Sequence, residues 1–188
     1  MKLGKILCLL LFALLLIGIL PAAGAAEAAE PDPTTDPVVL TWTDGSYISS
    51  FGENGKSFIA AARFTPDELE AYNFWTLDRV VFAVSDNQVS GISAYTVKVW
   101  KCGELVLGAY DPGVLVCSQE MSGPPALDEN GWATVELDSP VTVEGNEELW
   151  IGIEFTDYGD ECYPIKVASI SSVDPAKGRF IIRTGGVY

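Results

Sequence analysis

The sequence predicts an all-β domain, a jelly-roll-like antiparallel β-sandwich with one short helical turn. Short runs of β-branched and aromatic residues recur along the chain, and turns rich in Gly, Pro, Asn and Asp separate them. In the run 95–101, apolar and polar residues alternate, which places Tyr95, Val97 and Val99 on one face of a strand. Eight to ten such runs at this spacing are typical of a sandwich or barrel.

The N-terminus has the pattern of a cleavable signal peptide, over residues 1–26. Lys2 and Lys5 precede an apolar run, 6–20, and Pro21 and a stretch of small residues follow it. The run is shorter than the roughly 20 residues that cross a bilayer, so a retained anchor helix is the less favoured alternative. We therefore expect a protein that is secreted or lies at the cell surface.

Residues 27–37 are rich in Pro, Ala, Thr and acidic residues, which predicts a flexible acidic linker. A single β-sandwich domain would then span 38–188, a usual size for one domain. The net charge is −15, and removing the signal leaves nine basic against 26 acidic residues, or −17. Such a surface repels phosphate backbones and anionic lipid, so we expect no nucleic-acid partner and no membrane insertion of the mature domain.

Strands are predicted where β-forming residues fill a run between turn residues: 38–43, 58–64, 76–85, 95–101, 113–121, 132–137, 141–143, 149–155, 165–170 and 179–183. The run 58–64 is the weaker case because its three alanines favour helix. The expected inward-facing residues are Val80, Phe82, Val97, Val99, Val135, Leu137, Leu149, Ile151 and Ile153.

One helical turn is predicted to follow the run 58–64. Thr65 is a capping residue, Pro66 occupies the first helical position, and Glu68 follows the cap by three residues. The turn should run through Leu69 to about Tyr72.

Four cysteines become three once Cys8 leaves with the signal. Cys102 and Cys117 flank a predicted hairpin, so an oxidising compartment favours a disulfide between them. Cys162 would then be free for an intermolecular disulfide. The sequence also allows Cys162 to pair with either of the other two.

The chain contains no histidine, which excludes Ser-His-Asp and Cys-His nucleophile systems and imidazole-based zinc sites. It also lacks a Walker A motif and a dinucleotide-binding glycine pattern. We therefore expect that the protein is not an enzyme. A carboxylate-dependent glycoside hydrolase is an alternative, since such an enzyme needs only two suitably placed acids.

Aromatic rings in loops are candidates for ligand binding, because flat apolar faces of sugars stack on them. The candidates are Tyr47, Phe51, Phe74, Trp75, Tyr110 and Tyr158. Tyr110 stands beside the turn Asp111-Pro112-Gly113, where we expect an exposed loop apex.

Structural calcium is a further possibility, because this ion takes carboxylate and carbonyl oxygens from loops. Asp157, Asp160 and Glu161 surround a Gly turn and could converge on one ion. The segment 128–131 is a second candidate loop. Solvated acidic turns are the simpler interpretation of both.

Three segments resemble the cleaved-adhesin-type domains of bacterial surface proteins, the group that includes the haemagglutinin and adhesin regions of gingipains. They are Phe58–Leu69, Val97–Trp100 and Glu148–Gly152, in this order and spacing. The resemblance covers most of 38–188 and implies a jelly-roll-like sandwich, secretion and a role in adhesion. It departs from the family after Tyr163, where relatives tend to have a Gly-rich segment.

Together these observations predict an adhesin-like binding module that recognises an extracellular glycan or protein through loops of the sandwich. The alternative from a different class is a structural or assembly subunit of the cell envelope without a discrete ligand.

Overall fold

The computed structural model describes residues 37–41, 47–53, 56–106, 109–168, 178–183 and 186–187. These residues belong to one compact unit, Pro31–Tyr188. The predicted signal peptide, and all of the predicted linker except Pro37, lie outside the described residues.

Strands make up most of the described chain. The elements are β1 (Tyr47–Phe51), β2 (Phe58–Phe64), α2 (Pro66–Leu69), η1 (Glu70–Tyr72), β3 (Thr76–Ala83), η2 (Val89–Gly91), β4 (Ile92–Lys101), β5 (Glu104–Val106), β6 (Ala109–Asp111), β7 (Val114–Ser122), β8 (Trp132–Thr142), β9 (Leu149–Tyr158), β10 (Ile165–Ala168), β11 (Gly178–Arg183) and β12 (Gly186–Val187).

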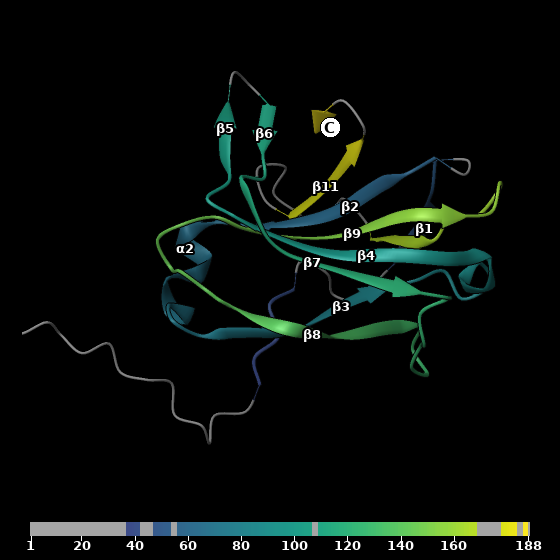
Figure 1. The fold of residues 1–188 in the computed structure, drawn as a ribbon, viewed down its shortest axis with the longest axis horizontal. Coiled ribbons are helices and arrows are strands. Elements are labelled where there is room, and N and C mark those ends of the chain that lie inside the picture. The colour runs from purple at the N-terminus through teal and green to yellow at the C-terminus, as the bar shows by residue number, and fades with distance from the viewer. Residues whose placement is uncertain are drawn as a thin grey trace, which may run out of the picture. The chain divides into compact units, whose positions relative to one another are not determined.

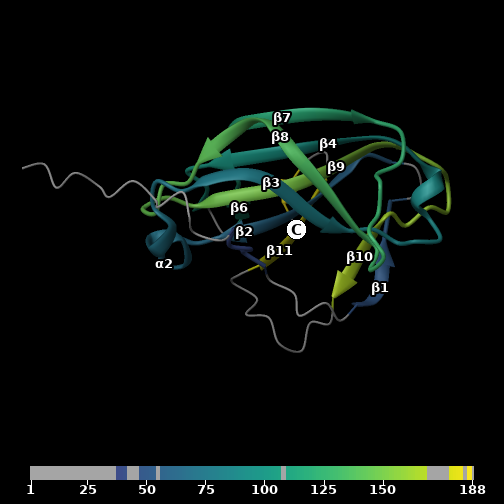
Figure 2. The same ribbon diagram turned by 90° about the horizontal axis from the view of Figure 1, so that it is seen from below.

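The strands form two layers (Figure 1). One layer is a six-stranded sheet in the order β12-β11-β2-β9-β4-β7, with every pair antiparallel. The other contains the pairs β3–β8 and β1–β10, which a bridge between Val84 and Ile165 connects. Figure 2 shows β3 and β8 passing over the six-stranded sheet. The predicted all-β sandwich is thus confirmed.

The core lies between the two layers. The inward-facing residues predicted from the sequence are buried, except that Ile151 is partly buried against the same cluster. Phe58 and Phe155 stack at its centre with ring centroids 5.3 Å apart. Leu69, from the helical turn, is fully buried and covers one part of the core.

The strand β2 has the predicted bounds although alanines occupy its middle. Ala60 and Ala62 face the core, while Ile59, Ala61 and Arg63 face the outer side of the sheet. Small residues fit this position because β2 is covered on both faces. Tertiary packing therefore overrides the helix propensity of alanine.

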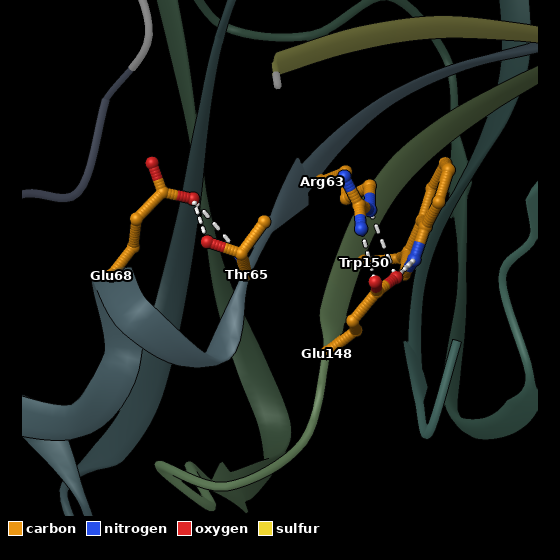
Figure 3. Close-up of polar contacts among 5 residues, drawn as sticks. All are labelled: Arg63, Thr65, Glu68, Glu148 and Trp150. Atoms are coloured by element: carbon orange, nitrogen blue, oxygen red, sulfur yellow. Dashed lines mark hydrogen bonds and ion pairs between the residues drawn. The ribbon is translucent and has the colours of Figure 1, made fainter. Parts of the chain in front are cut away.

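The predicted helical turn is present as α2, followed by η1. The backbone N–H and the hydroxyl of Thr65 both donate to Glu68 Oε2, at 2.9 and 2.8 Å (Figure 3). This hydrogen bonding ends β2 and turns the chain toward the other layer.

Three predictions of local structure were wrong, in whole or in part. Residues 37–41 form no strand, although 38–43 had been predicted as one, and residues 42–43 lie outside the described part. The predicted strands 132–137 and 141–143 are one continuous strand, β8, which passes through Pro140. The strand β1 falls where the sequence predicted a loop.

Candidate functional site

Two aromatic rings meet where β1 and β8 begin. Tyr47 and Trp132 are the first residues of these strands, and their ring centroids lie 5.6 Å apart in an edge-to-face arrangement. Both side chains are partly exposed. Such a pair is worth about 0.5–1.5 kcal/mol, so the rings hold each other in place while part of their apolar surface faces solvent.

Two charged side chains flank this pair. Lys166 Nζ, from β10, lies 5.7 Å from the Tyr47 ring centroid and 2.8 Å from Asp86 Oδ1. The Lys166 side chain is 18% exposed and that of Asp86 is 67% exposed. The carboxylate is therefore accessible to hydroxyl donors beside an aromatic surface. We call Tyr47, Trp132, Asp86 and Lys166 the aromatic patch.

A tight turn positions Trp132 in the aromatic patch. Asp128 Oδ1 accepts hydrogen bonds from the backbone N–H groups of Asn130 and Trp132, each at 2.9 Å. Gly131 has φ +79°, and a Cβ at this position would collide with Asp86 and Lys166. The carboxylate of Asp128, predicted as a calcium ligand, thus fixes the turn.

Sequence reasoning found Tyr47 but not its partners. Trp132 was assigned only to a strand, and Asp86 and Lys166 come from other parts of the chain. The one available signal was the turn 128–131, because its Asp, Asn and Gly residues predict a turn directly before Trp132.

Two other predicted rings belong to the core. Phe51 packs edge-to-face on Phe58, with centroids 5.1 Å apart. Tyr158 is 5% exposed; its hydroxyl accepts from the N–H of Glu53 and donates to the carbonyl of Lys56. Burial raises the pKa of Tyr158. Both rings stabilise the sandwich, and Tyr158 also holds Glu53 and Lys56, so neither ring presents a free face to a ligand.

Trp75 forms a second edge-to-face pair, with Tyr72 at 5.6 Å. Phe74 beside it is 46% exposed and has φ +65°, a conformation that bulky residues rarely adopt. Hydrogen bonds between Phe74 N–H and the carbonyl of Val143, and between Val143 N–H and the carbonyl of Trp75, hold this backbone.

Tyr110 does not stand at an exposed apex. It lies in β6 and packs on the outer face of the six-stranded sheet, 6.0 Å from Trp150 between ring centroids. The Arg63 guanidinium lies 4.7 Å from the Tyr110 ring centroid. The hairpin β5–β6 therefore rests on the sheet through this ring.

Beneath Tyr110, Arg63 and Glu148 form a bidentate ion pair, and both side chains are 12% exposed (Figure 3). Glu148 Oε2 also accepts a hydrogen bond from Trp150 Nε1 at 3.0 Å. The hydrogen bond to Glu148 raises the pKa of Arg63. This network joins β2, β9 and the hairpin, which is a structural role.

The predicted calcium ligands Asp157, Asp160 and Glu161 are all exposed. Among the described residues, no group of three or more carboxylate, thiol or imidazole side chains is gathered as a metal site requires. Calcium at this turn stays a prediction.

The predicted disulfide between Cys102 and Cys117 is not formed, and both thiols are free. Cys117 lies opposite Val99 in the β4–β7 register. Three residues of strand, about 10 Å, separate that position from Cys102, whereas a disulfide needs Cα atoms within about 7 Å. The Cys102 thiol instead donates to Glu147 Oε2 at 2.7 Å.

Cys162 lies at the other end of β4, beside Gly91, and is 4% exposed. Its thiol donates to the carbonyl of Gln88, and burial raises its pKa. The length of β4, about 30 Å, separates it from Cys102, which rules out that pairing in this structure. An intermolecular disulfide through Cys162 would first require this thiol to become exposed.

Comparisons with protein-family models, with curated proteins and with solved structures found no match to this chain. Within the described part of the chain, no helix has both the length and the apolar character needed to span a membrane.

Proposed function

We propose that this chain is an extracellular binding module whose aromatic patch recognises a glycan. The observation that carries the proposal is the pairing of Tyr47 and Trp132 beside the 67% exposed carboxylate of Asp86. Carbohydrate sites combine an aromatic surface for the apolar face of a sugar with a polar group that fixes its hydroxyls. Lys166 holds the Asp86 carboxylate in position.

The sequence supports an extracellular and non-catalytic role. The signal pattern of residues 1–26 and the resemblance to cleaved-adhesin-type domains both favour adhesion outside the cytoplasm. The absence of histidine removes the commonest proton-transfer group.

The test is binding of the purified protein to a glycan array, with Trp132→Ala compared against Trp75→Ala. Both tryptophans are partly exposed and each meets a tyrosine edge-to-face at 5.6 Å, so they are matched controls. We expect Trp132→Ala to weaken binding about tenfold, because one lost ring contact is worth about 1.4 kcal/mol. Trp75→Ala should leave binding unchanged.

A second comparison concerns the polar group. Asp86→Asn keeps the size of the side chain and removes its charge, so it should weaken binding less than Asp86→Ala does. EDTA should leave binding unchanged, because hydrogen bonds from Asp128 already hold the turn that carries Trp132. Loss of binding in Trp75→Ala, but not in Trp132→Ala, would move the site to the other aromatic pair and overturn the proposal.

A further inference from the structure

The two charges of the aromatic patch are presented unequally to solvent. Lys166 Nζ lies 2.8 Å from Asp86 Oδ1, but the lysine side chain is 18% exposed and the aspartate side chain is 67% exposed. The same Nζ lies 5.7 Å from the centroid of the Tyr47 ring. The ammonium is therefore mostly covered and already paired, whereas the carboxylate faces solvent. A ligand that reaches the rings meets a negative group, not a positive one.

Two further carboxylates lie beside the aromatic patch. Asp128 and Glu129 are exposed and belong to the turn that ends at Gly131. This glycine packs directly on the patch, since a Cβ there would collide with the Asp86 carboxylate and with Lys166 Nζ. Within the described part of the chain, neither Asp128 nor Glu129 forms an ion pair. Three carboxylates thus accompany the one ammonium of the patch, and the surface is negative.

We infer that the aromatic patch selects a glycan with protonated amino groups, such as a chain of unacetylated glucosamine. The inference rests on the proposed glycan binding and names the class of sugar. The rings of Tyr47 and Trp132 contact the apolar face of the sugar, and the Asp86 carboxylate accepts from the sugar ammonium. Hydrogen bonds between charged groups are roughly twice as strong as those between neutral groups, so an ammonium binds more tightly here than a hydroxyl does.

An anionic glycan fits the same surface poorly. A carboxylated or sulfated sugar needs an accessible cation, and Lys166 would have to leave Asp86 to reach it. The carboxylates of the turn before Trp132 repel such a sugar at short range, and the chain as a whole, with a net charge of −15, repels it at long range. The expected order of affinity is therefore amino sugar, then uncharged sugar, then anionic sugar.

Three hexamers of β-1,4-linked glucosamine test this order, because they share one backbone and differ only at nitrogen. The first has free amines, the second is N-acetylated, and the third is succinylated and carries carboxylates. Calorimetric titration of the protein expressed from the full coding sequence is done below the pKa of the sugar amines and above that of ordinary carboxylates. We expect the free-amine hexamer to bind about two- to fivefold more tightly than the acetylated one, and the succinylated one to bind most weakly. Added NaCl should reduce the difference.

Glu129→Gln tests whether the charge beside the patch causes the preference. It removes one charge of the turn and leaves the hydrogen bonds of Asp128 in place. We expect about twofold weaker binding of the free-amine hexamer and unchanged binding of the acetylated one. Glu70→Gln is the matched control: Glu70 is also exposed, but it lies beside Gly145, near the opposite end of β8 from Trp132 and on the order of 30 Å away. It should change neither affinity.

The outcomes separate this inference from the proposed function. If the acetylated or succinylated hexamer bound at least as tightly as the free-amine one, and Trp132→Ala weakened that binding, the inference would be overturned and glycan binding at the patch would stand. A preference for amines that Trp132→Ala does not weaken, or that Glu70→Gln reduces as much as Glu129→Gln does, would be general attraction of a cation to an acidic chain. That result would also overturn the inference, whereas the glycan array tests the proposed function independently.

Discussion

At the scale of single residues, the ion pair between Arg63 and Glu148 is a largely buried polar contact on the outer face of the six-stranded sheet, with both side chains 12% exposed. Its hydrogen bonds are charge-assisted and bidentate, and Trp150 adds another. Replacing only one residue of such a pair destabilises the fold, because the charge of the other residue stays largely buried without a partner.

We expect Glu148→Gln to lower the free energy of unfolding by about 2–4 kcal/mol, measured by urea denaturation. The double variant Arg63→Met/Glu148→Leu should recover most of this loss, since it leaves no unpaired charge. Glu154→Gln is the control: its ion pair with Lys98 is more exposed, at 23% and 20%, and should contribute less than about 1 kcal/mol. If Glu148→Gln and Glu154→Gln lowered the free energy of unfolding equally, this would contradict the structural role of the Arg63–Glu148 pair.

Cys102 is exposed, and its reactivity depends on one neighbour. The thiol hydrogen bond to Glu147 is the main reason that its pKa is raised, so little thiolate forms at neutral pH. Glu147→Gln removes the negative charge, which lowers the pKa and increases the thiolate fraction.

Alkylation of Cys102 by iodoacetamide at pH 8 should therefore be several-fold faster in Glu147→Gln than in the unmodified protein. Mass spectrometry locates the alkylated cysteine, and buried Cys162 is the internal control because its rate should not change. The difference should shrink as the pH rises through the thiol pKa. A slower reaction in Glu147→Gln would show that the carboxylate activates the thiol instead.

At the scale of elements, the hairpin β5–β6 is held on the sheet by a close backbone approach. Gly103 begins the hairpin, and a Cβ there would collide with the indole of Trp150 and the carbonyl of Asp111. Trp150 is fully buried as a result. The hairpin can adopt this conformation because residue 103 is glycine, which has no Cβ.

Gly103→Ala should destabilise the fold by about 1–3 kcal/mol, because overpacking moves the hairpin away from Trp150. Thermal unfolding measures the loss, and a red shift in tryptophan emission would report the exposed indole. Gly159→Ala is the control, since a Cβ there meets nothing within 4 Å. An unchanged melting temperature for Gly103→Ala would contradict the prediction, because it would mean that moving the hairpin away from Trp150 does not destabilise the fold.

At the scale of the whole molecule, the large negative charge opposes the folded state. Like charges lie closer together in the folded chain than in the unfolded one, and salt screens their repulsion. We expect the melting temperature to rise by a few degrees from low to physiological NaCl, measured by calorimetry. Asp160→Asn/Glu161→Gln, at an exposed turn, should make this dependence shallower.

The same measurement bears on calcium. At equal ionic strength, solvated acidic turns should give the same rise in melting temperature with CaCl₂ as with NaCl, whereas a specific calcium site should give a larger rise with CaCl₂. A larger rise with CaCl₂ that Asp160→Asn removes would instead establish calcium at residues 157–161.

The fold class and most of the core could be predicted from the sequence, because alternation along a strand decides which side chains face inward. The cap at Thr65 was likewise predictable, since its partner Glu68 lies three residues away. Such features depend on neighbours in the chain, which the sequence shows directly.

The tertiary structure decided which segments that are distant in the sequence come into contact. Only the tertiary arrangement brings Tyr47 of β1, Trp132 of β8 and Lys166 of β10 together, because β1 pairs with β10 whereas β8 pairs with β3. Likewise, only the strand order places β7 at the end of the described six-stranded sheet. Cys102 and Cys117, which the sequence paired, are separated by the bulge and register of the β4–β7 pair. Contacts between distant segments depend on how strands are ordered and aligned, and local sequence patterns do not carry that information.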